Sequence, residues 1–476
     1  MKLRILLNSF VTAAVVLAPS SGGYVRYTPY NEARPILEAM AEIAPAEVRD
    51  APAEKKEQEW SRWIERRDEE IRKRLAQGDI DSVVNFLMFG TSFTTEPRLT
   101  SAQVKLVSSD TPGASAQKIT ATWQRVFEKR VHDLVQGMAV PGTNERLQFA
   151  RKTLARAGIP LSPGAENSQA RAYIYENVKR VLHEQAGFQQ TLAQAKGLND
   201  PTEEFAERSK LYKERGLSLD TSLPPNYALE VALKEMRERK MLKAGSVVRV
   251  GIIGPGLDFT DKQEGYDFYP TQTVQPFAVM DSLLRLGLAK ASDVEVDTLD
   301  LSPRILEHVE HAKRAAAKGR GYTIQLPRDP GRGWNGELVD YWKRFGDQIG
   351  APAKPVAVPS GLSGVNLRAV RVRPDFVTRM RTYDVNIVLQ RAEIRKAEEK
   401  FDLLIATNIL VYYDTFEQSI ALTNIAAMLK PGGYLLTNNA LLELSSSQIH
   451  SVGYCTVVYS DHPDDGDHIV WYRKHG

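Results

Sequence analysis

Residues 401–414 of the chain read FDLLIATNILVYYD, and residues 429–436 read LKPGGYLL. In the first stretch an apolar run ends at a polar residue, Asn408, and a pair of aromatic residues, Tyr412 and Tyr413. A helical pattern follows at 415–429, and Pro-Gly-Gly then makes a turn into a second apolar run. Strand, helix and strand in this order are typical of a parallel sheet covered by helices, so the stretch predicts an α/β fold.

The same alternation of apolar runs and helical stretches extends over residues 244–476. The predicted strands are 247–253, 294–301, 385–389, 401–406 and 434–437. Two further runs, 455–459 and 468–472, flank an Asp-Gly pair that favours a tight reversal. We therefore predict a Rossmann-like, mainly parallel sheet with a C-terminal antiparallel hairpin. Insertions are expected at 259–276 and 319–364, and the second is a candidate lid over the sheet edge.

The part of the chain before residue 244 is predicted to be all-helical. We divide it into a helical segment with linkers and a loop, 23–115, and a helical region, 116–243. In the first segment apolar residues at helical spacing run from Trp60 to Leu75, and Gly78 is expected to end this helix. Further helices are predicted at 81–89, 116–137, 144–157, 168–186 and 227–241.

Residues 1–22 resemble a secretory signal peptide, with a basic start, an apolar run and small residues after it. Export to the periplasm or the medium is expected if this leader acts as one, and a cytoplasmic protein otherwise. No stable membrane span is predicted, because no other segment approaches the required length. Lys and Arg total 62 against 59 Asp and Glu, so no nucleic-acid partner is expected. The single cysteine, Cys455, excludes an internal disulfide and a multi-cysteine metal site.

Two other strand ends carry residues suited to binding a nucleoside. Residues 250–258 read VGIIGPGLD, so a buried strand enters a glycine turn where the backbone can approach a ligand closely. Residues 296–304 read VDTLDLSPR, which places Asp300 where a carboxylate can accept both hydroxyls of a ribose. Each motif also has a structural interpretation, a plain tight turn for the first and a helix cap for the second.

Together the three motifs resemble class I S-adenosylmethionine-dependent methyltransferases over about half the chain. Residues 401–414 and 429–436 are most similar to the chemotaxis-receptor glutamate methyltransferases. The resemblance implies S-adenosyl-L-methionine as cofactor and gives each matching position a role. Gly254 and Gly256 would line its methionine part, Asp300 would hold the ribose, Asn386 would lie near the adenine, Asn408 and Ile409 would lie beside the sulfonium, and Tyr412 and Tyr413 would contact the substrate.

The sequence departs from the superfamily pattern around the first motif. An acid is usual two residues before the first glycine, where this chain has Ile252, and a third glycine is usual where it has Asp258. The missing carboxylate is expected from Asp258, or from Glu264 or Asp267 in the insertion, which is also a candidate to close over the methyl donor.

The sequence thus predicts a methyltransferase whose acceptor is a small molecule or a protein. A carboxylate acceptor is ionised near neutral pH and needs no base, whereas a hydroxyl or an amine needs one, and Tyr412 and Tyr413 are the candidates. No metal site is predicted. Two alternatives stay open, a non-catalytic binding protein on the same fold and a nicotinamide-dependent oxidoreductase. The second lacks the third glycine of the dinucleotide fingerprint.

Overall fold

A computed structural model describes residues 24–99, 114–195, 216–218, 221–259, 266–360, 362, 364–438, 440–462 and 465–475. The expected leader, part of the loop before residue 114, and Glu264 lie outside these described residues. Within the described part of the chain, no helix combines the length and the apolar character needed to cross a membrane.

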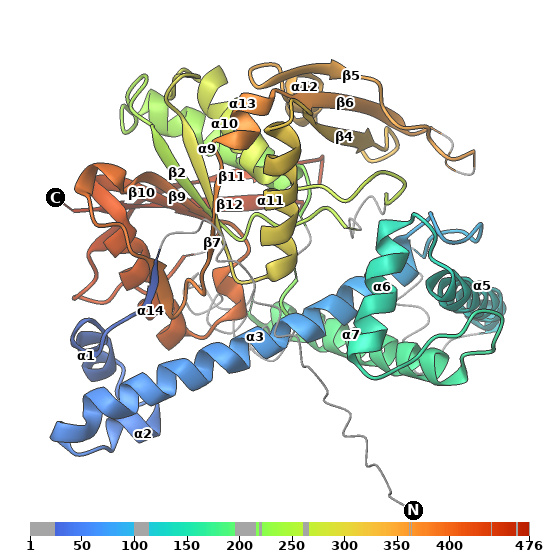
Figure 1. Cartoon of the computed structure of the whole chain (residues 1–476), viewed down its shortest axis with the longest axis horizontal. Helices are drawn as coiled ribbons and strands as arrows, with labels where there is room; N and C mark the ends of the chain where they lie inside the picture. Colours follow the sequence, from blue (N-terminus) through green and yellow to red (C-terminus); the bar gives the residue numbers. More distant parts are fainter. Residues whose placement is uncertain are drawn as a thin grey trace, which may run out of the picture.

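The C-terminal half is built on a seven-stranded sheet (Figure 1). In spatial order its strands are β11 (Ile449–Val458), β12 (Gly466–Lys474), β10 (Leu429–Thr437), β9 (Phe401–Ala406), β2 (Arg249–Ile253), β3 (Glu295–Asp300) and β7 (Arg381–Asp384). The five strands from β10 to β7 are parallel, and β12 is antiparallel to both of its neighbours. The predicted Rossmann-like sheet with a C-terminal antiparallel hairpin is confirmed.

The strand order places a topological switch point between β2 and β9. From β2 the chain runs outward through β3 to β7, returns to β9 on the other side of β2, and continues to β10. Crossover segments therefore leave β2 and β9 in opposite directions, and a crevice opens beyond their carboxyl ends. Ligands of doubly wound sheets bind in this crevice.

Helices cover both faces of the sheet, and the side chains of the strands alternate between them. On one face Val250 and Ile252 of β2 pack with α9 (Pro224–Glu238) and α10 (Gln275–Arg285). On the other, Leu404 and Ala406 of β9 pack with α14 (Thr415–Met428), α1 (Tyr30–Ala39) and the first half of α3 (Lys56–Phe89). Ile252, which stands where the superfamily usually has an acid, is thus fully buried in the core.

Two acids in residues 401–414 explain the local structure of this stretch. Asp402 accepts hydrogen bonds from the backbone N–H groups of Val248 and Arg249, at 2.9 and 2.8 Å, and from the Lys430 ammonium at 2.7 Å. It therefore ties the start of β2 to β9 and to the irregular first part of β10. Asp414 begins α14 with a capping box, since its side chain accepts from the N–H of Glu417 and the Glu417 side chain accepts in return.

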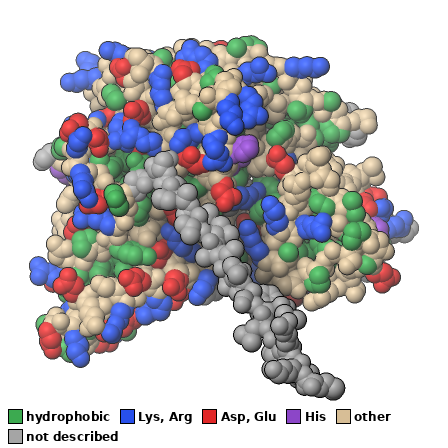
Figure 2. Space-filling view, in the orientation of Figure 1, with side chains coloured by type: hydrophobic (Ala, Val, Ile, Leu, Met, Phe, Trp, Pro, Cys, Tyr) green, Lys and Arg blue, Asp and Glu red, His purple; other side chains and the backbone are tan. Residues whose placement is uncertain are grey.

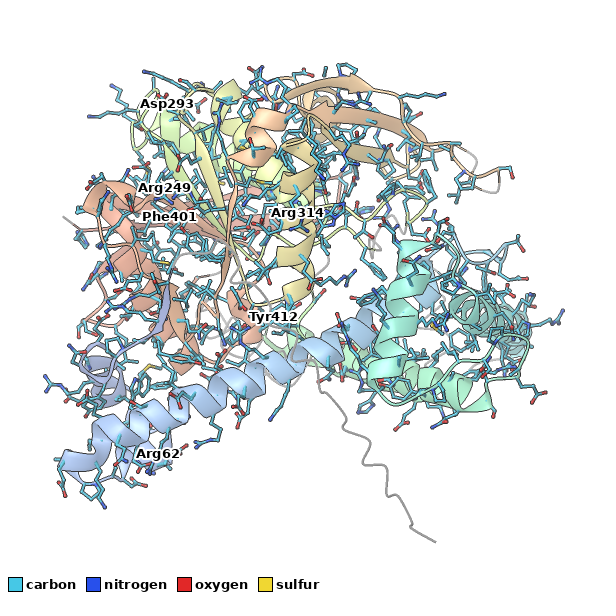
Figure 3. The ribbon with its side chains drawn as sticks, viewed as in Figure 1. Arg62, Arg249, Asp293, Arg314, Phe401 and Tyr412 are labelled. Carbon is cyan, nitrogen blue, oxygen red and sulfur yellow. The ribbon has the colours of Figure 1, made fainter. Side chains whose placement is uncertain are left out.

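The amino ends of these strands carry a structural cluster. The buried Arg249 pairs with Asp297 and lies over the ring of Phe401, 5.3 Å from its centroid. Figure 3 shows Arg249 and Phe401 side by side, with Tyr412 farther along toward α3. This cluster stabilises the end of the sheet that is remote from the carboxyl ends of the strands.

Helix α3 runs without a break from Lys56 to Phe89, so the prediction that Gly78 ends a helix is wrong. Gly78 is instead a contact point. A Cβ atom there would lie 1.9 Å from the carbonyl oxygen of Leu217, so only glycine lets the segment 216–218 cross the helix. The sequence around Gly78 does not show the contact with Leu217, which is far away in the chain, so the glycine was interpreted as the end of a helix.

The second half of α3 joins a separate helical cluster with α5 (Ala114–Ala139), α6 (Glu145–Arg156) and α7 (Ser168–Ala195) (Figure 1). The first half packs on the sheet, and β1 (Val25–Tyr27) pairs with β8 (Gln390–Ala392). One long helix therefore links the helical cluster to the α/β part. The remaining helix of ordinary length is α11 (Pro303–Ala316). The short elements are α2 (Ala46–Arg49), η1 (Ala53–Lys55), α13 (Pro374–Thr378), η2 (Ala397–Glu399) and η3 (Leu410–Tyr412).

The insertion at 319–364 forms most of a second sheet. This sheet has three antiparallel strands in the order β4 (Tyr322–Arg328), β6 (Asn366–Val372) and β5 (Gly350–Ala353), and α12 (Gly336–Arg344) packs with it. Its apolar side chains, among them Ile324, Leu338 and Tyr341, join the core that α9 and α10 share with the main sheet. On the face seen in Figure 2, basic and acidic side chains are interspersed.

Candidate active site

A pocket lies at the switch point and encloses about 910 Å³ of empty space, counted out to its mouth. Gly254 after β2, Asp300 at the end of β3 and Asn408 after β9 all line it. Three motifs that are far apart in the sequence therefore meet at one cavity.

The glycine turn after β2 forms the floor of the pocket. Gly254 and Gly256 both have left-handed backbones, with φ of +66° and +68°, and both line the pocket. A Cβ atom on Gly254 would lie 2.1 Å from the Ile409 side chain, which comes from the neighbouring strand end. The turn needs glycine for its conformation and for the close approach of Ile409, itself a lining residue.

Asp300 is an acid buried in the wall of the pocket, with 6% of its surface exposed. Its Oδ1 atom accepts a hydrogen bond from the backbone N–H of Ser302 at 2.7 Å. Burial raises the pKa of Asp300 to about 7, and the backbone hydrogen bonds only partly offset that effect. A ligand that donates hydroxyl hydrogen bonds to this carboxylate would replace its lost hydration.

Asn408 has a left-handed backbone, with φ of +57°, which asparagine adopts more readily than most other residues. Its backbone N–H donates to Oδ1 of Asn438 at 2.8 Å, and its own Oδ1 accepts from the Asn438 amide. These bonds hold the turn after β9 in the shape that brings Asn408 and Ile409 to the pocket.

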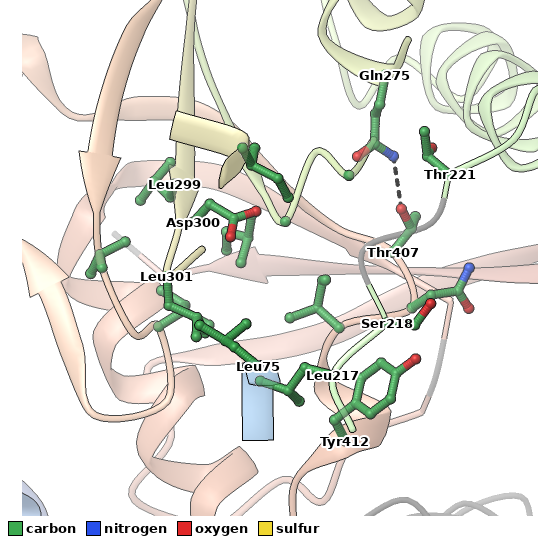
Figure 4. A pocket seen from close by; sticks show the side chains of 18 of the residues that line it. Leu75, Leu217, Ser218, Thr221, Gln275, Leu299, Asp300, Leu301, Thr407 and Tyr412 are labelled. Atoms are coloured by element: carbon green, nitrogen blue, oxygen red, sulfur yellow. Dashed lines mark hydrogen bonds between the residues drawn. The ribbon is translucent and has the colours of Figure 1, made fainter. Parts of the chain in front are cut away.

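The two tyrosines also line the pocket, but their environments differ. Tyr413 is buried, burial raises its pKa well above the ordinary value, and the Arg74 guanidinium lies 5.7 Å from its ring centroid. Its phenol therefore stays protonated at neutral pH. Tyr412 is half-buried and faces the cavity beside Leu217 (Figure 4).

The structure does not place Asn386 or Asp258 in this pocket. Asn386 is fully buried and donates to Oδ1 of Asp68 on α3 at 2.8 Å, while its neighbours Val385 and Ile387 reach the pocket. Asp258 lies two residues beyond Gly256 and accepts from the Tyr269 hydroxyl and the Gln272 amide. Asp267 accepts four hydrogen bonds from Thr91 and Ser92 and so anchors the insertion to the helical part.

Several lining residues were not anticipated from the sequence. Gln275, the first residue of α10, donates to the Thr407 hydroxyl at 2.8 Å across the pocket (Figure 4). The N-terminal half adds a wall made of Leu75 on α3 with Leu217, Ser218, Thr221, Ser222 and Pro225. Thr407 immediately precedes Asn408, so its position in the motif could have identified it as a residue of the pocket. Nothing local marked the segment 217–225.

The charge of the pocket is distinctive. Asp300 is the only carboxylate among the described residues that line it, and neither lysine nor arginine lines it there. The lining thus favours a cationic ligand over an anionic one. Across the described part of the chain, no group of three or more His, Cys, Asp and Glu side chains is arranged to hold a metal ion.

No protein-family model matches the sequence, and no curated protein does. Solved structures with some likeness include the N-methyltransferase NodS from Bradyrhizobium japonicum, at 14% identity over 52% of this chain and 97% of that one, with a TM-score of 0.25. A methyltransferase from Clostridium acetobutylicum (10%, 54% and 94%, TM-score 0.26) and magnesium protoporphyrin IX methyltransferase from Synechocystis (9%, 52% and 79%, 0.25) are others. These scores are too low to assign a family, so the fold assignment rests on the strand order and registers.

Proposed function

We propose that this chain is an S-adenosylmethionine-dependent methyltransferase that acts on a small-molecule or protein acceptor. The observation that carries the proposal is the convergence of Gly254, Asp300 and Asn408 on one pocket at the switch point. The resemblance of the three motifs supplies the identity of the methyl donor. The nearness to chemotaxis-receptor methyltransferases is a narrower proposal that rests on residues 401–414 and 429–436 alone.

The pocket suits the parts of the donor one by one. The Asp300 carboxylate accepts hydrogen bonds from the two ribose hydroxyls, and Val385 and Ile387 offer an apolar surface to the adenine. The glycine turn at Gly254 and Gly256 and the polar pair Gln275 and Thr407 line the part of the pocket where the methionine part would bind. When bound, the donor supplies an electrophilic methyl group on a positively charged sulfur.

The protein's own contribution to such a reaction is alignment and exclusion of water. Methyl transfer is an in-line displacement, so most of the acceleration comes from holding the acceptor in line with the methyl carbon. The pocket is covered from the helical side by Leu75 and by five residues that limit the access of water, namely Leu217, Ser218, Thr221, Ser222 and Pro225. The net positive charge of the donor also matches a pocket whose charged lining residue is an acid.

The glycine turn argues against the nicotinamide alternative. The dinucleotide fingerprint G-x-G-x-x-G leads directly into the helix whose N-terminus binds the pyrophosphate, whereas this chain has Phe259 at the position of the third glycine, and the next helix, α10, begins only at Gln275. The non-catalytic alternative is a binding protein on the same fold in which cofactor binding is degraded or lost. Its specific support is Ile252, which stands in the core where the superfamily has an acid.

Calorimetry on the full chain tests the proposal. We expect S-adenosylhomocysteine to bind with a dissociation constant in the micromolar range, about −8 kcal/mol, and NADH to bind at least a hundredfold more weakly. The variant Gly254→Val serves as the control. Its side chain does not fit the left-handed backbone at this position and would collide with Ile409, so we expect no heat of S-adenosylhomocysteine binding. Tight NADH binding together with no S-adenosylhomocysteine binding would contradict the proposal.

A further inference from the structure

A second cavity lies beside the pocket that is proposed to bind the methyl donor, and its empty space, together with the open solvent at its mouth, amounts to about 510 Å³. Thr221 and Ser222 line both cavities. Gly256 lines the first and Asp258 the second, and two residues of chain span at most about 7 Å. The backbone N–H of Thr221 donates to the carbonyl of Leu257, between those two residues, at 3.3 Å. The two cavities are therefore neighbours that share part of their wall.

The walls of the second cavity combine one acid with apolar and aromatic surface. Asp258 is the only charged side chain among the described residues that line it, and 7% of its surface is exposed. Leu326, Pro327 and Trp334 belong to the apolar wall, together with Leu223, Pro224 and Val274. A carboxylate set in such a wall selects an organic group with a positive charge or a hydrogen-bond donor at its tip.

Asp258 is held rigidly. The Tyr269 hydroxyl and the Gln272 amide both donate to its Oδ2 atom at 2.9 Å. Gln272 is fixed in turn by Gln325, which exchanges two hydrogen bonds of 2.8 Å with it. The carboxylate therefore keeps one orientation, as a site built to recognise a polar group requires.

The helical region holds this loop in place. Arg146, a buried residue of α6, donates to the backbone carbonyl of Asp258 at 3.3 Å and to those of Phe259 and Tyr269. One guanidinium thus fixes three points of the loop that carries the acid. This contact gives the helical region a positioning role in the second cavity.

We propose that the second cavity is the acceptor site and that the acceptor is an amine whose nitrogen binds at the Asp258 carboxylate. This inference rests on the proposed function. The carboxylate takes a proton from the ammonium and passes it to solvent. The nitrogen lone pair then forms the N–C bond to the methyl group, and the S–C bond breaks with its electron pair on sulfur. A carboxylate acceptor, which the sequence left open, is disfavoured because Asp258 carries a like charge.

The inference is tested with protein saturated with S-adenosylhomocysteine and two probes of similar shape and opposite charge. We expect fluorine NMR to show 4-fluorobenzylamine binding at least tenfold more tightly than 4-fluorobenzoate. Asp258→Asn should remove this preference and leave the affinity for S-adenosylhomocysteine within about twofold. Asp329→Asn, which removes a nearby acid outside the cavity lining, is the matched control and should keep the preference.

A second variant covers the case in which Asp258→Asn disturbs folding. Trp334→Ala keeps the acid and removes part of the wall, so both probes should bind more weakly while the amine stays preferred. Equal binding of the two probes to the wild-type protein would overturn the inference and leave the proposed function intact. A tenfold loss of S-adenosylhomocysteine affinity in a folded Asp258→Asn would also overturn it, because the acid would then belong to the donor site. No binding of S-adenosylhomocysteine to the wild type would end both proposals.

Discussion

Gly78→Ala is expected to weaken S-adenosylhomocysteine binding at least tenfold, although Gly78 is not part of the pocket lining. Alanine normally stabilises a helix interior by about 1 kcal/mol relative to glycine. Here its Cβ atom would lie 1.9 Å from the Leu217 carbonyl oxygen, and because that neighbour is backbone, no side-chain rotation relieves the clash. The segment 216–218 must move off α3, and Leu217 and Ser218 leave the pocket wall with it.

Calorimetry and thermal unfolding of the same samples check this expectation. We expect the variant to unfold at a lower temperature than the wild type, with a loss of about 1–3 kcal/mol that is typical of overpacking. Gly336→Ala is the matched control, because Gly336 also lies in a helix and nothing is within 4 Å of a Cβ atom there. A Gly78→Ala protein that binds S-adenosylhomocysteine like the wild type and unfolds at the same or a higher temperature would refute this account of the glycine.

Asp300→Asn is expected to stabilise the ligand-free protein while it weakens the donor site. At pH 8 the wild-type carboxylate is buried and ionised. Its pKa in the folded state is about 7, well above the ordinary value of 3.8. At 1.36 kcal/mol per pKa unit, this difference corresponds to a destabilisation of about 4 kcal/mol that the amide avoids. The lost hydrogen bonds to the ribose should meanwhile weaken S-adenosylhomocysteine by about 1–3 kcal/mol, or 5- to 150-fold.

The pH dependence of stability follows from the raised pKa. The unfolded carboxyl loses its proton near pH 4 and the folded one near pH 7, so the folded state holds more protons between these values. The contribution of Asp300 to stability therefore falls as the pH rises from about 4 to 7 and is constant above. Donor binding should show the opposite trend and strengthen from pH 6 to 8, because the ribose hydroxyls favour the ionised form.

Melting temperatures and binding constants of the wild type and the variant across this pH range test both trends. Asp293→Asn is the matched control, since Asp293 is an exposed acid just before the same strand, far from the pocket (Figure 3). We expect it to leave stability and binding unchanged. An Asp300→Asn protein with wild-type affinity would remove Asp300 from the donor site.

The sequence predicted the parts of the fold that local patterns encode. Apolar runs that end in Gly254, Asp300 and Asn408 identified three parallel strands, because each polar or glycine residue interrupts a buried run at the point where the chain leaves the sheet. The Asp-Gly pair at 465–466 likewise indicated the closing hairpin. Since the carboxyl ends of parallel strands share one edge, the meeting of these residues at a pocket followed from the fold class.

Features that depend on distant contacts could not be predicted in the same way. The residues that cover the pocket from the helical side belong to no motif, because apolar and small residues of this kind occur on any packed surface. They are Leu75, Leu217, Ser218, Thr221, Ser222 and Pro225. Asn386 illustrates the reverse case. It matched the pattern of a ligand-binding residue, yet its amide satisfies the buried acid Asp68 on α3, a partner 318 positions away.

A crystal structure of the protein with S-adenosylhomocysteine tests the central claim most directly. We expect the ribose hydroxyls within hydrogen-bond distance of the Asp300 carboxylate, the homocysteine over the turn at Gly254 and Gly256, and the sulfur beside Asn408. A ligand seated elsewhere, or one that contacts only one of these three strand ends, would contradict the account.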